Sequence, residues 1–383
     1  MHRYLRYARD RLPALTELVR EMVECESPSD SPLRVNALVE LIKNKTRDVA
    51  RATTFPAHAF GDHLLLDFSS AEAEGKAILG LGHSDTVWPA GTLEHMPLRE
   101  AGGRLWGPGV LDMKCGLAIF IFAVRALQEH GVPIRKPLRL LVVSDEEVGS
   151  ISSRTLTEAE AQRSECVLVL EPGSAKDGKL KTARKGVGRY SIKIEGRAAH
   201  AGVDPENGAS AVVEAAHQVE KIAALNDLAQ GMSVNPGVIR GGTRPNVVAA
   251  EASVEVDVRM TRRGDADKID RMLRELQPVD PRCRISVEGG LNRPPMERSP
   301  AIAALFEKAR TVGAEMGLDL NESATGGASD GNFTAALGIP TLDGLGAIGE
   351  GMHAENESVF LDRLPERVAL LAGLLEHLML AER

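Results

Sequence analysis

Three short apolar runs, each followed closely by acidic residues or a histidine, constrain the fold of this chain more than any other feature. They cover residues 77–82, 138–143 and 166–170 and consist mostly of leucine, valine and isoleucine. A strand that is apolar along its whole length is typical of a parallel sheet with helices on both faces. The sequence therefore predicts an α/β fold with a largely parallel sheet flanked by helices.

Histidine and acidic residues gather just after these runs. The carboxyl ends of parallel strands open into one crevice, where α/β proteins bind ligands. His83 and Asp85 would point to the same face of a strand, and a carboxylate behind a histidine is typical of metal sites. Taken singly, a His-x-Asp pair more often hydrogen-bonds a loop, and Asp112 has the alternative role of a helix N-cap. Two further candidates come from loops elsewhere: Asp112 just before a predicted helix, and His353 after a strand predicted at 339–345. The full set is His83, Asp85, Asp112, Glu146, Glu147, Glu171 and His353.

The residue types in this set favour a metal centre. Imidazole and carboxylate groups suit Zn²⁺, Co²⁺ or Mn²⁺, whereas a thiolate zinc site is excluded because the four cysteines form no CxxC pair. The set holds more groups than one four-coordinate ion needs, which favours two ions bridged by a carboxylate and a water. Hydrolysis also needs a base outside the ligand set, and the pair Glu146-Glu147 can supply one ligand and one base.

Composition indicates a globular chain rather than a nucleic-acid-binding or membrane protein. The 383 residues allow two domains, 43% are hydrophobic, 26% are charged, and the formal net charge is −8. With no basic tract and no apolar stretch of membrane-spanning length, we expect neither a nucleic-acid nor a membrane partner. The first residues lack the apolar core of a signal peptide and the cysteines are scattered, so we expect a cytoplasmic protein with reduced thiols.

The residue pattern changes near position 185. Residues 190–195 and 252–259 alternate between apolar and polar side chains, which predicts strands of a sheet with one solvent-exposed face. Two helical patterns lie in the same region. We therefore expect a small α+β domain, residues 185–294, inserted into a discontinuous catalytic domain made of residues 1–184 and 295–383.

Six short motifs occur in order along essentially the whole chain. Together they resemble those of the co-catalytic zinc amidohydrolases, which include glutamate carboxypeptidase (carboxypeptidase G), aminoacylase-1, acetylornithine deacetylase and succinyl-diaminopimelate desuccinylase. The acidic pair Glu146-Glu147 and the strand-ending Glu171 favour the carboxypeptidase G branch. The motifs are His83-Ser-Asp85-Thr-Val, Gly107-Pro-Gly-x-x-Asp112-Met-Lys114, Asp145-Glu-Glu-x-Gly149, Glu171-Pro172, Gly196-x-x-x-His200-Ala-Gly202 and Gly326-Gly-x-Ser-Asp330.

The resemblance implies a zinc-exopeptidase-like catalytic domain with a mixed, largely parallel sheet, and two Zn²⁺ ions per chain. Co²⁺ or Mn²⁺ can replace zinc in sites of this chemistry. Glu146 would be the general base, and Asp85 would orient a ligand histidine. The implied ligands are His83 and Glu171 for one ion, Glu147 and His353 for the other, and Asp112 as the bridge.

For the inserted domain the resemblance implies a lid that forms a homodimer. His200 would stabilise the transition-state oxyanion in the partner subunit's active site, Arg259 would bind the substrate carboxylate, and Asn246 would face the same pocket. Gly326 and Gly327 would let the backbone approach that carboxylate. Without the resemblance these residues have simpler interpretations as a loop histidine, a solvent-exposed strand face and a plain turn.

The resemblance implies a di-zinc hydrolase that cleaves a small peptide or N-acyl amino acid at the amide next to a free carboxylate. The leading hypothesis is a glutamate carboxypeptidase-like exopeptidase that uses a metal-bridging hydroxide. The alternative is an N-acyl-amino-acid deacylase of acetylornithine deacetylase or succinyl-diaminopimelate desuccinylase type. An inactive metal-binding scaffold is disfavoured because Glu146 and a full ligand set are present. A nucleotide-binding protein is disfavoured because the glycine runs lack a phosphate-binding pattern.

Overall fold

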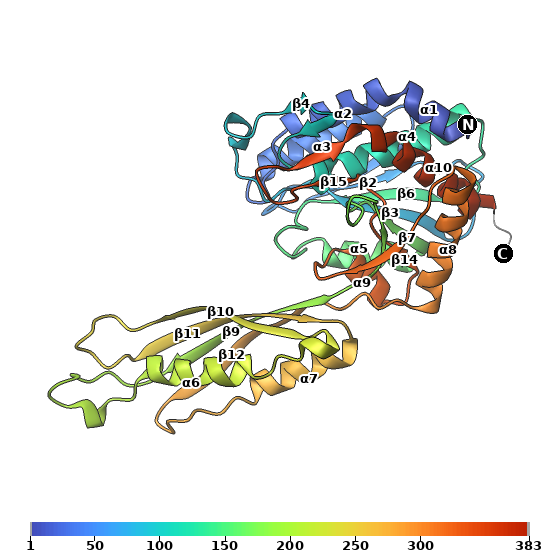
Figure 1. The fold of residues 1–383 in the computed structure, drawn as a ribbon. Helices are drawn as coiled ribbons and strands as arrows, with labels where there is room; N and C mark the ends of the chain where they lie inside the picture. The colour runs from blue at the N-terminus through green and yellow to red at the C-terminus, as the bar shows by residue number, and fades with distance from the viewer. Residues whose placement is uncertain (1, 381–383) are drawn as a thin grey trace. The chain divides into compact units, whose positions relative to one another are not determined.

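The computed structural model describes residues 2–380, which form two compact units (Figure 1). The larger unit contains the described residues up to Ala183, Arg298–Thr325, and the described residues from Ser329 onward. The smaller unit contains Arg184–Glu297 and Gly326–Ala328. Within residues 2–380, no helix combines the length and the apolar character that crossing a membrane requires.

A six-stranded sheet with the order β1-β2-β6-β3-β7-β14 forms the centre of the larger unit. Strands β6, β3, β7 and β14 run parallel, whereas β2 is antiparallel to both β6 and β1. The predicted α/β fold with a mixed, largely parallel sheet is therefore confirmed. The strands are β1 Arg51–Phe55, β2 His63–Asp67, β3 Ala77–His83, β6 Leu138–Val143, β7 Ser164–Val169 and β14 Thr341–Leu342.

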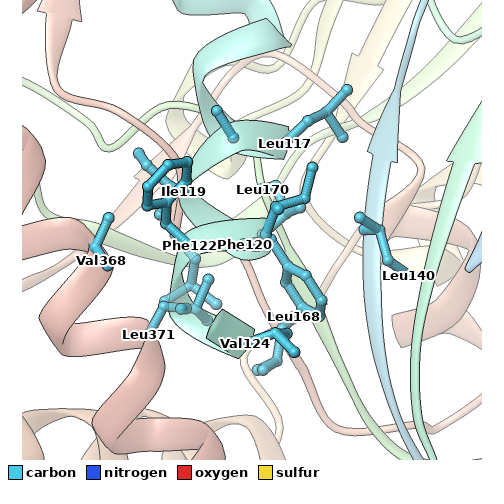
Figure 2. Packing of buried hydrophobic residues seen from close by; sticks show 14 of the residues in the cluster. Leu117, Ile119, Phe120, Phe122, Val124, Leu140, Leu168, Leu170, Val368 and Leu371 are labelled. Carbon is cyan, nitrogen blue, oxygen red and sulfur yellow. The ribbon is translucent and has the colours of Figure 1, made fainter. Parts of the chain in front are cut away.

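Both faces of the central strands are buried, which explains why most residues of these strands are apolar. Along β6, Leu140 lies in the main core cluster, and the next residue, Leu141, lies in a second cluster on the opposite face. Figure 2 shows the main cluster, in which Leu140 and Leu168 of the sheet lie near helix α4 together with Val368 and Leu371 of helix α10. The helices of this unit are α1 Arg3–Asp10, α2 Leu12–Glu24, α3 Pro32–Thr46, α4 Cys115–Glu129, α5 Arg154–Gln162, α8 Pro300–Glu315, α9 Gly331–Ala336 and α10 Leu364–Leu380.

Helix α4 packs closely on the middle strand β3. A Cβ atom at Gly80 would lie 2.4 Å from Cε2 of Phe120, so a glycine at this position lets the helix approach the strand. The helix begins at Cys115, three residues after Asp112. Its buried packing therefore anchors one end of the loop that carries Asp112.

Two small sheets complete the larger unit. One has the order β15-β16-β5-β4, and in it β16 pairs antiparallel with β5, with Ser358 opposite Trp106. This pairing joins the segment after His353 to the segment before Asp112. The strands are β4 Arg99–Ala101, β5 Arg104–Trp106, β15 Gly349–Glu350 and β16 Ser358–Phe360, and the second small sheet pairs β8 Leu180–Arg184 with β13 Glu322–Thr325.

The smaller unit is an antiparallel sheet with the order β10-β11-β9-β12 and two helices. Alternate residues of β9 and β11, such as Ile192 and Val254, are buried in one cluster with Ile222 of α6 and Ile269 of α7. The predicted alternation of buried and solvent-facing side chains is present in both strands. The elements are β9 Gly186–Glu195, α6 Ala211–Ala223, β10 Ser233–Gly241, β11 Glu251–Met260, α7 Arg263–Arg274 and β12 Arg284–Arg293.

Candidate metal centre

Three neighbouring strands of the large sheet bring a histidine and acidic residues to the same edge. Strand β3 lies between β6 and β7, and His83 at its end is opposite Val143 of β6. Glu146 and Glu147 follow β6, and Glu171 follows β7. Because these strands are parallel, their carboxyl ends meet at one edge, and residues distant in sequence become neighbours.

The side chains at this edge form two overlapping clusters. Ligand atoms of His83, Asp112 and Glu147 lie within 4.8 Å of one another, and so do those of His83, Glu146 and Glu171. His83 Nε2 is 3.0 Å from Asp112 Oδ1 and 3.7 Å from Glu171 Oε1. These residues are buried or nearly so, which limits competition from bulk water.

His353 approaches the same centre from the loop between β15 and β16. Its Nε2 atom lies 3.0 Å from Asp112 Oδ2 and 3.4 Å from Glu147 Oε2. The two oxygens of Asp112 therefore face two different histidines, which is the geometry of a bridging carboxylate. His353 has a φ angle of 60°, a left-handed conformation that is uncommon for a non-glycine residue and concentrates at functional sites.

The loop before α4 holds Asp112 away from the helix end. Lys114, rather than Asp112, is the N-cap residue, and the Asp112 carboxylate faces the two histidines instead. The alternative interpretation of Asp112 as an N-cap is therefore wrong.

Behind the loop, Lys114 is buried and donates from Nζ to the Cys25 carbonyl oxygen at 2.9 Å. Burial lowers the pKa of Lys114 to about 8.

Asp85 connects His83 to the turn that carries the two glutamates. His83 Nδ1 donates to the Asp85 backbone carbonyl oxygen at 2.9 Å, and Asp85 Oδ1 lies farther away, at 3.4 Å. That Oδ1 atom accepts a hydrogen bond from the Glu146 N–H at 3.2 Å. Its Oδ2 atom accepts hydrogen bonds from the Glu147 N–H at 3.1 Å and from the Ser29 hydroxyl at 2.7 Å. Asp85 thus orients the histidine ring mainly through its backbone carbonyl oxygen, while its buried carboxylate fixes the backbone of the acidic pair.

The carboxylates make this edge strongly attractive to positive charge. Burial opposes protonation of His83, but hydrogen bonds with Asp112, Asp85 and Glu171 outweigh it and raise its pKa well above the usual value. Hydrogen bonds with Asp112 and Glu147 raise the pKa of His353 to about 10. Burial would raise the pKa of Asp112, but the two histidines outweigh it and lower that pKa.

Glu147 supplies a test of whether the site suits a cation. Burial raises its pKa to about 6, so part of the carboxyl group would be neutral near pH 6 without a compensating charge. Within residues 2–380, its buried Oε1 atom has no hydrogen-bond partner. A buried oxygen in that position costs free energy unless a cation or donor meets it. The centre offers imidazole nitrogens and carboxylate oxygens, so it fits the borderline metal ions of the zinc group.

The candidate residues of the inserted region belong to the smaller unit. His200 is exposed, and its Nδ1 atom accepts the Gly202 N–H at 3.2 Å. Asn246 lies beside it, because its carbonyl oxygen accepts the Ala201 N–H at 3.0 Å. Arg259, on β11, makes a two-pronged ion pair with Asp257 at 2.8 and 3.0 Å. The structure thus groups His200 with Asn246 and gives Arg259 an acidic partner of its own.

The two glycines of the Thr325–Asp330 segment show no steric need for glycine. A Cβ atom at Gly326 would meet open space, and one at Gly327 would lie 3.9 Å from the Arg184 guanidinium. Arg184 donates to the Gly327 carbonyl oxygen at 3.1 Å. The simpler interpretation of this segment as a turn is consistent with this geometry, and its role in binding a carboxylate stays a prediction.

Sequence reasoning missed one buried acidic residue beside the centre. Glu357 lies four residues after His353, and its carboxylate accepts hydrogen bonds from the loop that carries Asp112. Glu355, in the same short loop, is exposed. No local pattern separates the two glutamates, because the burial of Glu357 depends on a segment about 245 positions earlier in the chain.

Residues 80–377 match the sequence profile of Peptidase family M20/M25/M40. The chain belongs to this family. The resemblance inferred from the six motifs is therefore confirmed, and this M20 protein is a metal-dependent hydrolase of the peptidase class. It is 30% identical over 375 residues to Carboxypeptidase G2 of Pseudomonas sp. (strain RS-16), covering 96% of the chain and 90% of that protein. It is 27% identical over 409 aligned positions to acetylornithine deacetylase of Proteus mirabilis (strain HI4320), covering 97% and 99%.

Solved structures share the fold of this M20 protein. Aminopeptidase PepT from Bacillus cereus ATCC 10987 superimposes with a TM-score of 0.78 at 22% identity, covering 95% of the chain and 98% of PepT. The M20 family metallo-carboxypeptidase Sso-CP2 from Sulfolobus solfataricus gives a TM-score of 0.74 at 15% identity, covering 96% and 99%. At these identities the likeness concerns the fold, and the choice of substrate is a separate question.

Proposed function

We propose that this M20 hydrolase is a two-zinc, carboxypeptidase G-like exopeptidase that cleaves an amide bond next to a free carboxylate, with C-terminal glutamate as the leading substrate group. The observation that carries the proposal is the position of Asp112, whose two oxygens lie 3.0 Å from two different histidines. Each histidine also has a second carboxylate nearby, at 3.7 Å for Glu171 and 3.4 Å for Glu147. Such an arrangement supplies two ligand sets that share one carboxylate.

The roles of the ligands follow from these distances. Two zinc ions, when bound, would polarise the substrate carbonyl and lower the pKa of a shared water. The ligand groups of the chain would supply the negative charge that holds the ions and would set the spacing between the two ion sites. The residues that would do so are His83 and Glu171 for one ion, Glu147 and His353 for the other, and Asp112 between them.

Glu146 is the proposed general base. It would accept a proton from the attacking water and deliver that proton to the leaving amine. Its ligand-type oxygen lies within 4.8 Å of the corresponding atoms of His83 and Glu171, so it is close to the centre. The hydrogen bond from its N–H to Asp85 fixes the backbone from which its side chain extends.

Residues of the smaller unit would bind the rest of the substrate. Arg259 makes a bidentate ion pair with the Asp257 carboxylate. A substrate carboxylate would use the same bidentate geometry in place of Asp257. The Gly202 N–H donates to His200 Nδ1, which leaves Nε2 as the nitrogen that would face an oxyanion in the partner subunit's active site. Asn246, adjacent to His200, and the backbone at Gly326 and Gly327 are the further proposed contacts.

A homodimer through the smaller unit is part of the proposal. Strand β10 is an edge of its sheet, and Val238 and Ile239 on it are exposed. Val212 and Val213 of the neighbouring helix α6 are exposed as well. An unpaired edge beside apolar side chains is a surface that a second copy can cover. Light scattering should give a dimer for wild type and a monomer for Ile239→Glu, whereas a wild-type monomer with full activity would contradict this part.

A deacylase of acetylornithine type is the second candidate. Acetylornithine deacetylase of Proteus mirabilis aligns with almost the whole chain, so the match gives a specific reason to keep this substrate class. Both candidates use the same metal centre and differ in the substrate groups that they accept. They are therefore separated by assay rather than by the geometry of the centre.

The deciding experiment combines metal analysis with a substrate panel. Purified protein should contain about two zinc ions per chain, a stoichiometry typical of two-metal hydrolases. The panel would hold a folate-type glutamate amide, an N-acyl-glutamate, Ala-Glu, acetylornithine and succinyl-diaminopimelate. Turnover of the glutamate compounds supports the proposal, and turnover of acetylornithine alone supports the second candidate. Absence of bound metal, or activity that survives complete metal removal, would contradict both.

A further inference from the structure

Glu357 is a buried carboxylate that has no part in the roles proposed above. Its side chain is 0% exposed. One oxygen, Oε1, accepts the backbone N–H groups of Leu111 at 2.8 Å and Asp112 at 3.1 Å, and the other, Oε2, accepts the N–H of Gly109 at 3.0 Å. All three donors belong to the loop that presents Asp112 to the two histidines.

The loop cannot satisfy these donors by regular helical bonding. Asp112 has φ −113° and ψ 97°, which lies outside the helical region, and Gly109 has a left-handed φ of 71°. Neighbouring backbone N–H groups that converge in this way, here those of Gly109, Leu111 and Asp112, form a concave anion-binding surface. Glu357 fills that surface, so the buried carboxylate and the buried N–H groups satisfy one another.

The same carboxylate also joins three segments of the chain. The Trp88 indole N–H donates to Glu357 Oε2 at 2.8 Å, from the segment that follows Asp85. The Gly107 N–H donates to the Glu357 carbonyl oxygen at 3.3 Å, where β5 and β16 are paired. Glu357 lies four residues from His353 along a short loop. Its hydrogen bonds therefore connect the loop that carries His353 to the loop that carries Asp112.

We propose that Glu357 is a positioning residue that sets the spacing between His353 and Asp112 and thereby the affinity for the metal ion held by them. This inference rests on the proposed function, because it requires a metal-binding centre. Loss of groups that orient metal ligands typically lowers affinity by about 10- to 100-fold. Substitution of Glu357 should mainly lower the affinity for the ion bound by Glu147 and His353. The ion bound by His83 and Glu171 shares Asp112, but its affinity should change less, because its other two ligands lie at the end of β3 and just after β7, which are paired in the central sheet.

Two substitutions of Glu357 distinguish a role in positioning the metal ligands from a role in fold stability alone. Glu357→Gln keeps the side-chain volume and the oxygen facing Leu111 and Asp112, but it places an NH₂ group opposite the donors Gly109 and Trp88. Glu357→Ala removes all four hydrogen bonds and is expected to be less stable. Since Glu357→Gln preserves half of the acceptor geometry, it remains the decisive variant if Glu357→Ala does not fold.

Glu214 provides a matched control in the smaller unit. It is also a buried glutamate, and its carboxylate accepts the backbone N–H groups of Val279 at 2.9 and 3.1 Å and of Asp280 at 2.9 Å. Glu214→Gln therefore removes a comparable buried contact without touching the Asp112 loop. It should lower the melting temperature and leave metal binding unchanged.

The measurement is a zinc titration of chelator-stripped full-length protein against a chromophoric competitor, with thermal melting in parallel and no substrate present. Wild type and Glu214→Gln should bind two equivalents with equal affinities. For Glu357→Gln, the dissociation constant of one equivalent should rise about 10-fold or more, while the other stays within a few-fold. A lower melting temperature with both affinities unchanged would overturn the positioning role and leave the metal centre standing. A wild-type protein that binds no zinc would instead overturn the proposed function together with this inference.

Discussion

Substitution of Glu146 and Glu147, one at a time, by glutamine tests the division of labour in the acidic pair. The two residues are adjacent, carry the same side chain, and both donate a backbone N–H to Asp85. The proposal nevertheless assigns proton transfer to Glu146 and metal binding to Glu147. The glutamine variants should therefore fail in different ways.

The magnitude for Glu146→Gln follows from the loss of a base. Glutamine has almost the same size but cannot accept the proton, so kcat should fall about 100- to 10,000-fold, the usual contribution of a positioned acid-base group. This corresponds to about 2.7–5.5 kcal/mol in the activation free energy. The five ligand groups of the proposal are untouched, so the metal content should stay at the wild-type level.

Glu147→Gln should lower metal affinity first. Glu147 Oε2 lies 3.4 Å from His353 Nε2, and its buried Oε1 has no hydrogen-bond partner within residues 2–380, so both oxygens can face a cation. Steady-state kinetics and metal analysis after dialysis would be measured on both variants. Full activity of Glu146→Gln, or loss of metal from it with retention by Glu147→Gln, would refute the assignment.

Three further outcomes are expected. Gly80→Ala places a methyl group against the ring of Phe120 and should lower the free energy of unfolding by about 1–3 kcal/mol in urea titrations, whereas Gly264→Ala, where the added Cβ meets open space, should not. Prolonged chelation should abolish hydrolysis, and zinc or cobalt should restore it; magnesium restoring it equally well would contradict a site built from imidazole. Arg259→Gln should raise KM about 10- to 100-fold for substrates with a free carboxylate, with kcat changed little; an unchanged KM would remove Arg259 from the substrate site.

The fold was largely predictable because its signals are local. The mostly apolar runs at β3, β6 and β7 indicate strands buried on both faces, and the alternation along β9 and β11 indicates a sheet with one solvent-exposed face. Because these periodicities arise from the geometry of a single strand, they can be recognised without knowing which strands pair with it. Helix α1 and the small β5–β16 pairing carry no comparably strong local signal.

The set of residues that meet at the candidate metal centre was predictable in part. Parallel strands deliver His83, Glu147 and Glu171 to one edge. Asp112 and His353 were candidates from the sequence as well, and the family resemblance assigned their roles as ligands. The alternative role of Asp112 as an N-cap could be rejected only from the folded structure, because both roles place an acid just before a helix.

By itself, the sequence determined the class of fold, the family and the chemical types of the groups available for catalysis, because periodicity and motif spacing are properties of short segments. The tertiary structure decided which buried carboxylates serve those groups. The link between Asp85 and His83 was predicted from their spacing, but the contact of Asp85 with Glu146, about 60 positions away, was not. Glu357 is an ordinary acidic residue until the Asp112 segment, about 245 positions away, buries it and supplies its donors. Burial and partner choice depend on packing between distant segments, and only the folded chain establishes that packing.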